Sequence, residues 1–239
     1  MPELLPDVPE PDSRDQLRKV IVAALGPIPG ASLVVDLILA SPFQDRLIDW
    51  LRDLAEKFER LCERVEEIDP NALVKEEEFK TTFVNAMRLV TYTNRKEKHE
   101  MLRNAVLNSA LPDAPEDDER TVFLNLVESF SVAHIQCIRA FNLFPREEFN
   151  LALSLDAPHW RADMAVNQLY DFIQNVNSPT DLDFDLFLLI LTDLHSRGLL
   201  SSIRPESDKL DDVGEQPRLT TLGRKFLQFI ESPLDDKAS

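Results

Sequence analysis

The stretch Ser41–Ile68, SPFQDRLIDWLRDLAEKFERLCERVEEI, predicts a long helix. Ser41 can cap its N-terminus, Pro42 suits the first helical position, and Gln44 completes a capping box. Apolar residues then recur at alternating spacings of four and three, a 3.5-residue repeat over three heptads. This stripe consists of Leu47, Leu51, Leu54, Phe58, Leu61, Val65 and Ile68. A stripe along the whole helix predicts a second helix packed beside it.

The partner for this helix follows directly in the sequence. Asp69-Pro70-Asn71 turns the chain, and helical periodicity resumes by Glu76 and continues to Leu111, with a kink predicted between Thr91 and Asn94. The inward positions of this second arm are Phe79, Phe83, Met87, Val90, Leu102, Ala105 and Val106. We therefore predict a long helical hairpin over residues 41–111, and an antiparallel pair within the chain is favoured over a coiled-coil dimer.

A hydrophobic segment precedes this hairpin. Residues 20–40 contain one charge, Asp36, and their length of 21 residues is about that of a membrane-spanning helix. The sequence GPIPG at 26–30 divides the segment into two short halves, so we expect a helical hairpin buried against the bundle. The alternative is a hairpin that inserts into a membrane surface. The candidate partner or membrane contacts are Val20, Ile21, Ile28, Leu33, Val34, Leu37 and Ile38.

The last third of the chain predicts a small separate domain over residues 158–232. Two helices, 158–175 and 183–197, precede two short strands at 199–200 and 218–219. Gly198 can serve as the C′ residue of the second helix, and Thr220 can cap a final helix. This order of elements is typical of a winged helix–turn–helix. The helix 183–197 is apolar around most of its circumference, so we expect it to be buried rather than to read DNA.

Composition argues against several classes of protein. The chain has 43 acidic and 26 basic residues, a net charge of −17, so phosphate backbones repel it and nucleic acid is disfavoured as a partner. Its five glycines argue against a Rossmann or P-loop domain. With 44% hydrophobic and 29% charged residues, the composition is that of a folded chain and not of a wholly disordered one.

The sequence shows no constellation that would carry chemistry. No two of its four histidines are four residues apart, the spacing of a helical zinc site. Cys62 and Cys137 lie on apolar stripes, which indicates buried free thiols in a reducing cytoplasm; His134, three residues before Cys137, is a weak candidate activator. We predict no catalytic, cofactor-binding or metal-binding residue, no cofactor and no small-molecule substrate, and therefore not an enzyme.

One segment departs from the acidic average. From Lys75 to Arg103 the chain has seven basic and five acidic residues, and Arg95, Lys96 and Lys98 are grouped at its centre. The simplest interpretation is a solvated helix face that pairs with nearby acids. The alternative is a basic patch that docks an acidic partner.

Three motifs occur in order along the chain: NAVLNSA at 104–110, the pair FLNLV at 123–127 and Cys137-Ile138, and RGLL at 197–200 followed by LTTLGRKF at 219–226. In this order they resemble bacterial helical proteins of the abortive-infection alpha type, over about residues 66–230. The resemblance implies a bacterial cytoplasmic protein with a role in phage defence, and it supplies no catalytic residues.

Together these observations predict an all-α or mainly α chain. A helical bundle over 13–157 includes the hydrophobic hairpin 20–40 and the helical hairpin 41–111, a winged-helix-like domain with two short strands covers 158–232, and residues 1–12 and 233–239 form tails. We expect a non-enzymatic, cytoplasmic interaction or regulatory protein that binds a protein partner or itself. The alternatives are a peripheral membrane effector that uses residues 20–40, and a winged-helix transcription regulator.

Overall fold

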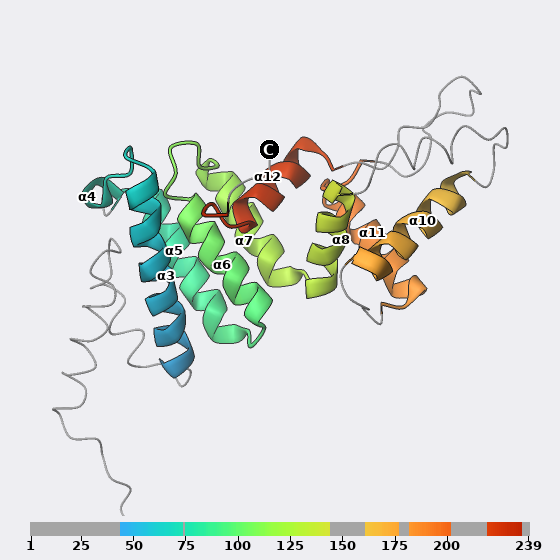
Figure 1. Cartoon of the computed structure of the whole chain (residues 1–239), viewed down its shortest axis with the longest axis horizontal. Coiled ribbons are helices and arrows are strands. Elements are labelled where there is room, and N and C mark those ends of the chain that lie inside the picture. Colours follow the sequence, from blue (N-terminus) through green and yellow to red (C-terminus); the bar gives the residue numbers. More distant parts are fainter. Residues whose placement is uncertain (1–43, 74, 144–160, 177–181, 202–218, 236–239) are drawn as a thin grey trace, which may run out of the picture. The chain divides into compact units, whose positions relative to one another are not determined.

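The computed structural model describes residues 44–73, 75–143, 161–176, 182–201 and 219–235 (Figure 1). Over these ranges the chain is all-α, which confirms the all-α part of the predicted fold class. Its helices are α3 (Gln44–Arg64), α4 (Pro70–Leu73), α5 (Glu77–Tyr92), α6 (Lys96–Asn108), α7 (Asp117–Ser129), α8 (Val132–Leu143), α10 (Arg161–Val176), α11 (Phe184–Ser196) and α12 (Thr221–Ile230). The predicted tail 1–12 and the hydrophobic segment 20–40 lie outside the described residues.

The chain divides into two compact units. Unit 1 comprises residues 1–128 together with 229–239, and unit 2 comprises residues 129–228. Helices α3 to α7 therefore belong almost entirely to unit 1, and α8, α10 and α11 belong to unit 2.

Helices α3, α5 and α6 form the core of unit 1, and each packs against the other two (Figure 1). Helices α5 and α6 cover the side of α3 that carries the predicted apolar stripe. The stripe residues from Leu47 to Leu61 are all buried. The helix ends at Arg64, four residues earlier than predicted. Ile68 is still buried, because the turn after α3 returns it to the core.

The predicted two-helix hairpin over 41–111 is wrong in one respect: its second arm is two helices. The chain leaves the helical conformation at Thr93, which is extended, and re-enters it after Arg95. The residues at the break, Thr91 to Asn94, include two threonines and an asparagine, which are weak helix formers. The kink predicted at this point is thus a full reversal, and α5 and α6 pack side by side against α3.

Helix α6 is the central helix of unit 1, with every residue from 101 to 110 buried. Three of its buried polar residues have partners, the first being Arg103, which forms an ion pair with Asp53 of α3. Asn104 Nδ2 donates to the carbonyl of Ile230 at 3.0 Å, and Asn108 Nδ2 donates to those of Phe229 and Glu231 at 2.9 and 2.8 Å. These amides attach the C-terminal end of α12 to unit 1.

Unit 2 has its own aromatic core. Helix α8 contacts both α10 and α11. Tyr170 of α10 lies 5.3 Å from the ring of Phe187 of α11, and its hydroxyl donates to the carbonyl of Leu182 at 2.8 Å. The rings of Phe130 and Phe226 meet edge to face at 6.0 Å.

The two predicted short strands are reduced to one antiparallel bridge in the described residues, between Leu200 and Leu219. Gly198, with φ +74°, ends α11 in the left-handed conformation, as predicted for a C′ glycine. Thr220 caps α12 as predicted, because its Oγ1 accepts from the Gly223 amide at 2.9 Å. The Thr220 amide also donates to the Leu199 carbonyl at 3.0 Å. Hydrogen bonds from the side chain and the backbone of Thr220 thus join residues 198–199 to the start of α12.

Candidate functional site

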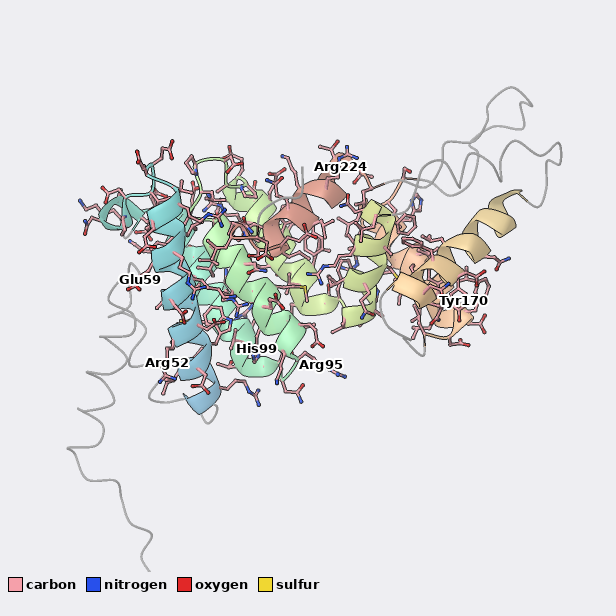
Figure 2. All side chains as sticks on the ribbon, in the orientation of Figure 1. Arg52, Glu59, Arg95, His99, Tyr170 and Arg224 are labelled. Carbon is pink, nitrogen blue, oxygen red and sulfur yellow. The ribbon has the colours of Figure 1, made fainter. Side chains whose placement is uncertain are left out.

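The turn between α5 and α6 is held by hydrogen bonds from two helices of unit 1. The Thr93 carbonyl accepts from Arg46 Nη1 of α3 at 3.0 Å and from His99 Nε2 of α6 at 2.9 Å. Trp50 Nε1 then donates to the His99 carbonyl at 2.8 Å. Figure 2 shows His99 and Arg95 near this end of the bundle. The backbone of the turn is thus tied to both helices beside it.

Four exposed side chains beside this turn form a surface that we call the α5 patch: Arg88, Tyr92, Arg95 and Lys96. Arg88 and Tyr92 are one helical turn apart, and Tyr92 is 78% exposed. Among the described residues, no carboxylate lies within ion-pairing distance of these three cations. Arg95, at the N-cap position of α6, makes no side-chain cap. The patch is therefore an unneutralised basic and aromatic surface.

Of the predicted basic cluster, the structure places Arg95 and Lys96 on this surface but directs Lys98 elsewhere. Lys98 Nζ donates to the carbonyl of Glu128 at 2.8 Å, near the C-terminus of α7. Burial lowers the pKa of Lys98, and the Glu128 carboxylate partly offsets that shift. A cation at this end of a helix is favourable, so Lys98 joins α6 to α7.

A second surface lies on α11 in unit 2. Leu186, Leu188 and Leu189 are 45%, 38% and 64% exposed, and together we call them the leucine face. The opposite side of the helix is buried through Phe187, Ile190, Leu191 and Leu194. The expectation that this largely apolar helix is buried therefore holds for one side only, because α11 exposes leucines on the other side. On α7, Val122 is likewise exposed.

Helices α8 and α11 bring a serine, a histidine and an aspartate together. Ser131 Oγ lies 2.8 Å from His134 Nδ1, and His134 Nε2 lies 3.4 Å from Asp193 Oδ2. Asp193 also pairs with Arg197 at 3.0 Å, and Arg197 lies over the Phe130 ring. In the catalytic triad of the serine proteases the serine contacts Nε2 of the histidine and the aspartate contacts Nδ1, the reverse of the arrangement at His134. Here Asp193 is shared between His134 and Arg197, so we interpret the group as a tie between α8 and α11.

The cysteines do not support nucleophilic chemistry. Cys137 is buried, and burial raises the pKa of its thiol to about 12. Burial also raises the pKa of the half-buried Cys62. A backbone hydrogen bond lowers this pKa, and the negative charge of Glu59 raises it further. His134 therefore does not activate Cys137, since a reactive cysteine needs a lowered pKa.

This burial predicts a large difference in thiol reactivity. At pH 8 the native chain should release about one equivalent of thionitrobenzoate from Ellman's reagent, slowly and from Cys62, and a second one only after denaturation. Cys62→Ala should abolish the native phase, and Cys137→Ala should leave it unchanged. Rapid native reaction of Cys62→Ala would contradict the burial of Cys137.

The described residues offer neither a cluster of metal ligands nor a single membrane-spanning helix. No group of three or more His, Cys, Asp or Glu residues there could hold a metal ion. No single described helix is long and apolar enough to cross a membrane, although α7 and α8 pass that test together as a bent pair. The candidate membrane contacts Val20, Ile21, Ile28, Leu33, Val34, Leu37 and Ile38 all lie outside the described residues.

Sequence reasoning missed several of the residues on these surfaces. Arg88 and Tyr92 occupy the side of α5 opposite its buried stripe, so their spacing of four was a readable signal. The leucines of α11 gave no such signal. When apolar residues surround most of a helix, the sequence pattern does not indicate which side is buried.

No protein-family model, curated protein or solved structure matches this chain.

Proposed function

We propose that this chain is a non-enzymatic interaction protein that binds a protein partner through the leucine face of α11. The observation that supports this most directly is the exposure of three leucines on a helix whose opposite side is buried. The helix has defined ends, because the Asp183 carboxylate caps it and Gly198 ends it. The leucines are therefore presented on a regular helix.

Covering this face would be energetically favourable. Full burial of one leucine side chain contributes roughly 1.5–3 kcal/mol relative to exposure. Leu186 and Leu189 are three residues apart, so both can enter the same groove of a partner. The bordering residues Asp183 and Asp185 are exposed and acidic, which favours a partner with basic side chains. The partner proposed is an amphipathic helix with an apolar stripe and basic flanks.

The predicted winged-helix-like domain and the predicted role in phage defence are compatible with this proposal. We also propose a winged-helix-like arrangement over residues 158–232, in which α11 would stand where DNA-binding members carry the recognition helix and its exposed side would contact protein instead. Leucines and aspartates on that side lack the basic and amide groups that read base edges. The phage-defence role implied by the resemblance to abortive-infection proteins, and a cytoplasmic location, complete the proposal.

Binding to a designed peptide tests the leucine face. The probe is a labelled helical peptide of about 16 residues with leucines at i, i+3, i+4 and i+7 and lysines on both flanks. Leu186→Glu with Leu189→Glu should weaken its binding about tenfold or more, measured by fluorescence anisotropy, because carboxylates would then occupy the apolar contact. Asn142→Glu with Asn175→Glu adds the same charge to exposed positions of unit 2, and should change affinity about threefold at most.

A photo-cross-linker at position 188 tests the same surface in cells that naturally express the chain. A discrete adduct with one protein, lost in the Leu186→Glu and Leu189→Glu background, would support the proposal. Equal loss of peptide binding in both double variants would overturn it, because the loss would then not depend on the leucine face. So would the absence of any adduct at position 188.

A further inference from the structure

We infer that the α5 patch of unit 1 binds an acidic protein segment. The segment would place carboxylates against Arg88, Arg95 and Lys96, and an apolar or aromatic side chain against the ring of Tyr92. This inference rests on α5 and the turn after it, and it is independent of the leucine face of α11.

The charge of the patch is opposite to that of the chain. Residues 88–96, RLVTYTNRK, hold three cations and no carboxylate in a protein of net charge −17. The cations are close in sequence, beside one turn, where their mutual repulsion opposes folding. An exposed cation without a carboxylate neighbour keeps its full charge for a ligand, whereas Arg52 and Arg60 of α3 each pair with an acid on their own helix. A ligand that brings carboxylates to the patch would relieve this repulsion.

The backbone beneath the patch is held in place before any ligand arrives. Arg46 and His99 both donate to the Thr93 carbonyl, and Trp50 holds His99 in turn. A binding surface on a fixed turn loses less conformational entropy on association than one on a free loop. Only the side chains of Arg95 and Lys96, and not the backbone that carries them, have to be ordered.

Tyr92 identifies the ligand as a protein segment with an apolar side chain. Tyr92 is more exposed than any other large hydrophobic residue in the part of the chain that the structure describes. Val84, two turns earlier on the same side of α5, is also exposed. Val84 to Tyr92 spans about 12 Å of helix, a length that an extended peptide covers with about four residues. Tyrosine and arginine are among the residue types that contribute most at protein interfaces.

A basic and aromatic surface also suits single-stranded nucleic acid, but the surroundings disfavour it. Glu97 and Glu100 are exposed on the first turns of α6, directly after Lys96. A nucleic-acid strand is longer than the patch and has a negatively charged phosphate at every nucleotide. The phosphates beyond the patch would be repelled by these glutamates and by the net negative charge of the chain. A short acidic peptide can end within the patch.

Binding of a defined peptide to the full chain tests this inference. The probe is a labelled peptide with two Asp-Glu pairs around one phenylalanine, compared with its Asn and Gln isostere and with a dT10 oligonucleotide. We expect the acidic peptide to bind with a dissociation constant well below about 1 mM, and the isostere not to bind. Arg88→Glu with Arg95→Glu should weaken binding of the acidic peptide at least about tenfold, and Tyr92→Ala should weaken it about tenfold.

The matched control is Arg52→Glu with Arg60→Glu, which changes the net charge of unit 1 by the same amount on exposed positions of α3. It should weaken binding of the acidic peptide by no more than about threefold, with circular dichroism verifying that all variants are folded. Equal weakening by both double variants would overturn the inference in favour of a general charge effect. Tighter binding of dT10 than of the peptide, lost in Arg88→Glu with Arg95→Glu, would replace it with a nucleic-acid site. If Tyr92→Ala leaves the affinity unchanged, no apolar side chain of the ligand packs on Tyr92, and the proposed ligand is wrong.

Discussion

Replacing Phe58 by alanine should lower the free energy of unfolding of unit 1 by about 3–5 kcal/mol. Phe58 lies in the middle of the α3 stripe and is 1% exposed, and its ring is 6.4 Å from that of Phe79 on α5. Its removal leaves a cavity at the α3–α5 contact, and the cost combines the lost burial with that cavity. This is among the largest effects that a single substitution produces in a folded protein.

Urea unfolding followed by tryptophan fluorescence measures this loss. A Trp160→Phe background leaves Trp50, in unit 1, as the only tryptophan. Phe58→Leu should cost less than Phe58→Ala, because it keeps most of the volume. Glu59→Ala, at the exposed neighbouring position, should change stability by less than about 0.5 kcal/mol. A loss under about 1 kcal/mol for Phe58→Ala would show that the stripe is not the core of the bundle.

Replacing Gly223 by alanine should destabilise unit 2 by about 3 kcal/mol. A Cβ atom at this position would lie 2.3 Å from the Leu199 carbonyl oxygen and 3.2 Å from Leu219 Cδ2. The oxygen belongs to the backbone and accepts from the Thr220 amide, so it cannot rotate away. Helix propensity alone predicts the opposite sign, a gain of about 1 kcal/mol for alanine over glycine within α12.

Gly198→Ala is the informative comparison for this prediction. A Cβ atom at Gly198 would meet no heavy atom within 4 Å, but the φ of +74° is unfavourable for a residue with a side chain. We expect a loss of about 1–2 kcal/mol there, and a smaller one for Gly198→Asn, because asparagine tolerates this conformation. Thermal unfolding and hydrogen exchange of residues 219–228 measure both effects. A stabilised Gly223→Ala chain would show that α12 does not approach Leu199 closely.

The candidate surfaces were only partly predictable from the sequence. Arg95 and Lys96 belong to the predicted basic patch and lie on the α5 patch, but Lys98 binds the end of α7. Charge counting cannot separate these residues, since each side chain's role depends on which helix faces it. For α11, periodicity was no guide, because leucines occupy both its buried and its exposed sides.

Local spacing along the chain was enough to predict an all-α protein and the apolar stripes that its helices bury. Residues three and four apart share a face of a helix wherever that helix is placed, so the pattern is visible without any knowledge of the fold. Thr220 and Gly198 were readable for the same reason, because a cap acts within a few residues of its helix end.

Which helices meet, and which sides they leave exposed, depends on contacts between distant segments. The reversal at Thr93 is held by Arg46, which lies 47 residues earlier in the chain. Asn108 holds the carbonyl of Phe229 across 121 residues, although its motif suggests only a helix end. The exposure of Leu189 depends on what the neighbouring helices leave uncovered. No local pattern relates such segments, because the hydrophobic effect is non-directional and selects burial without selecting the partner.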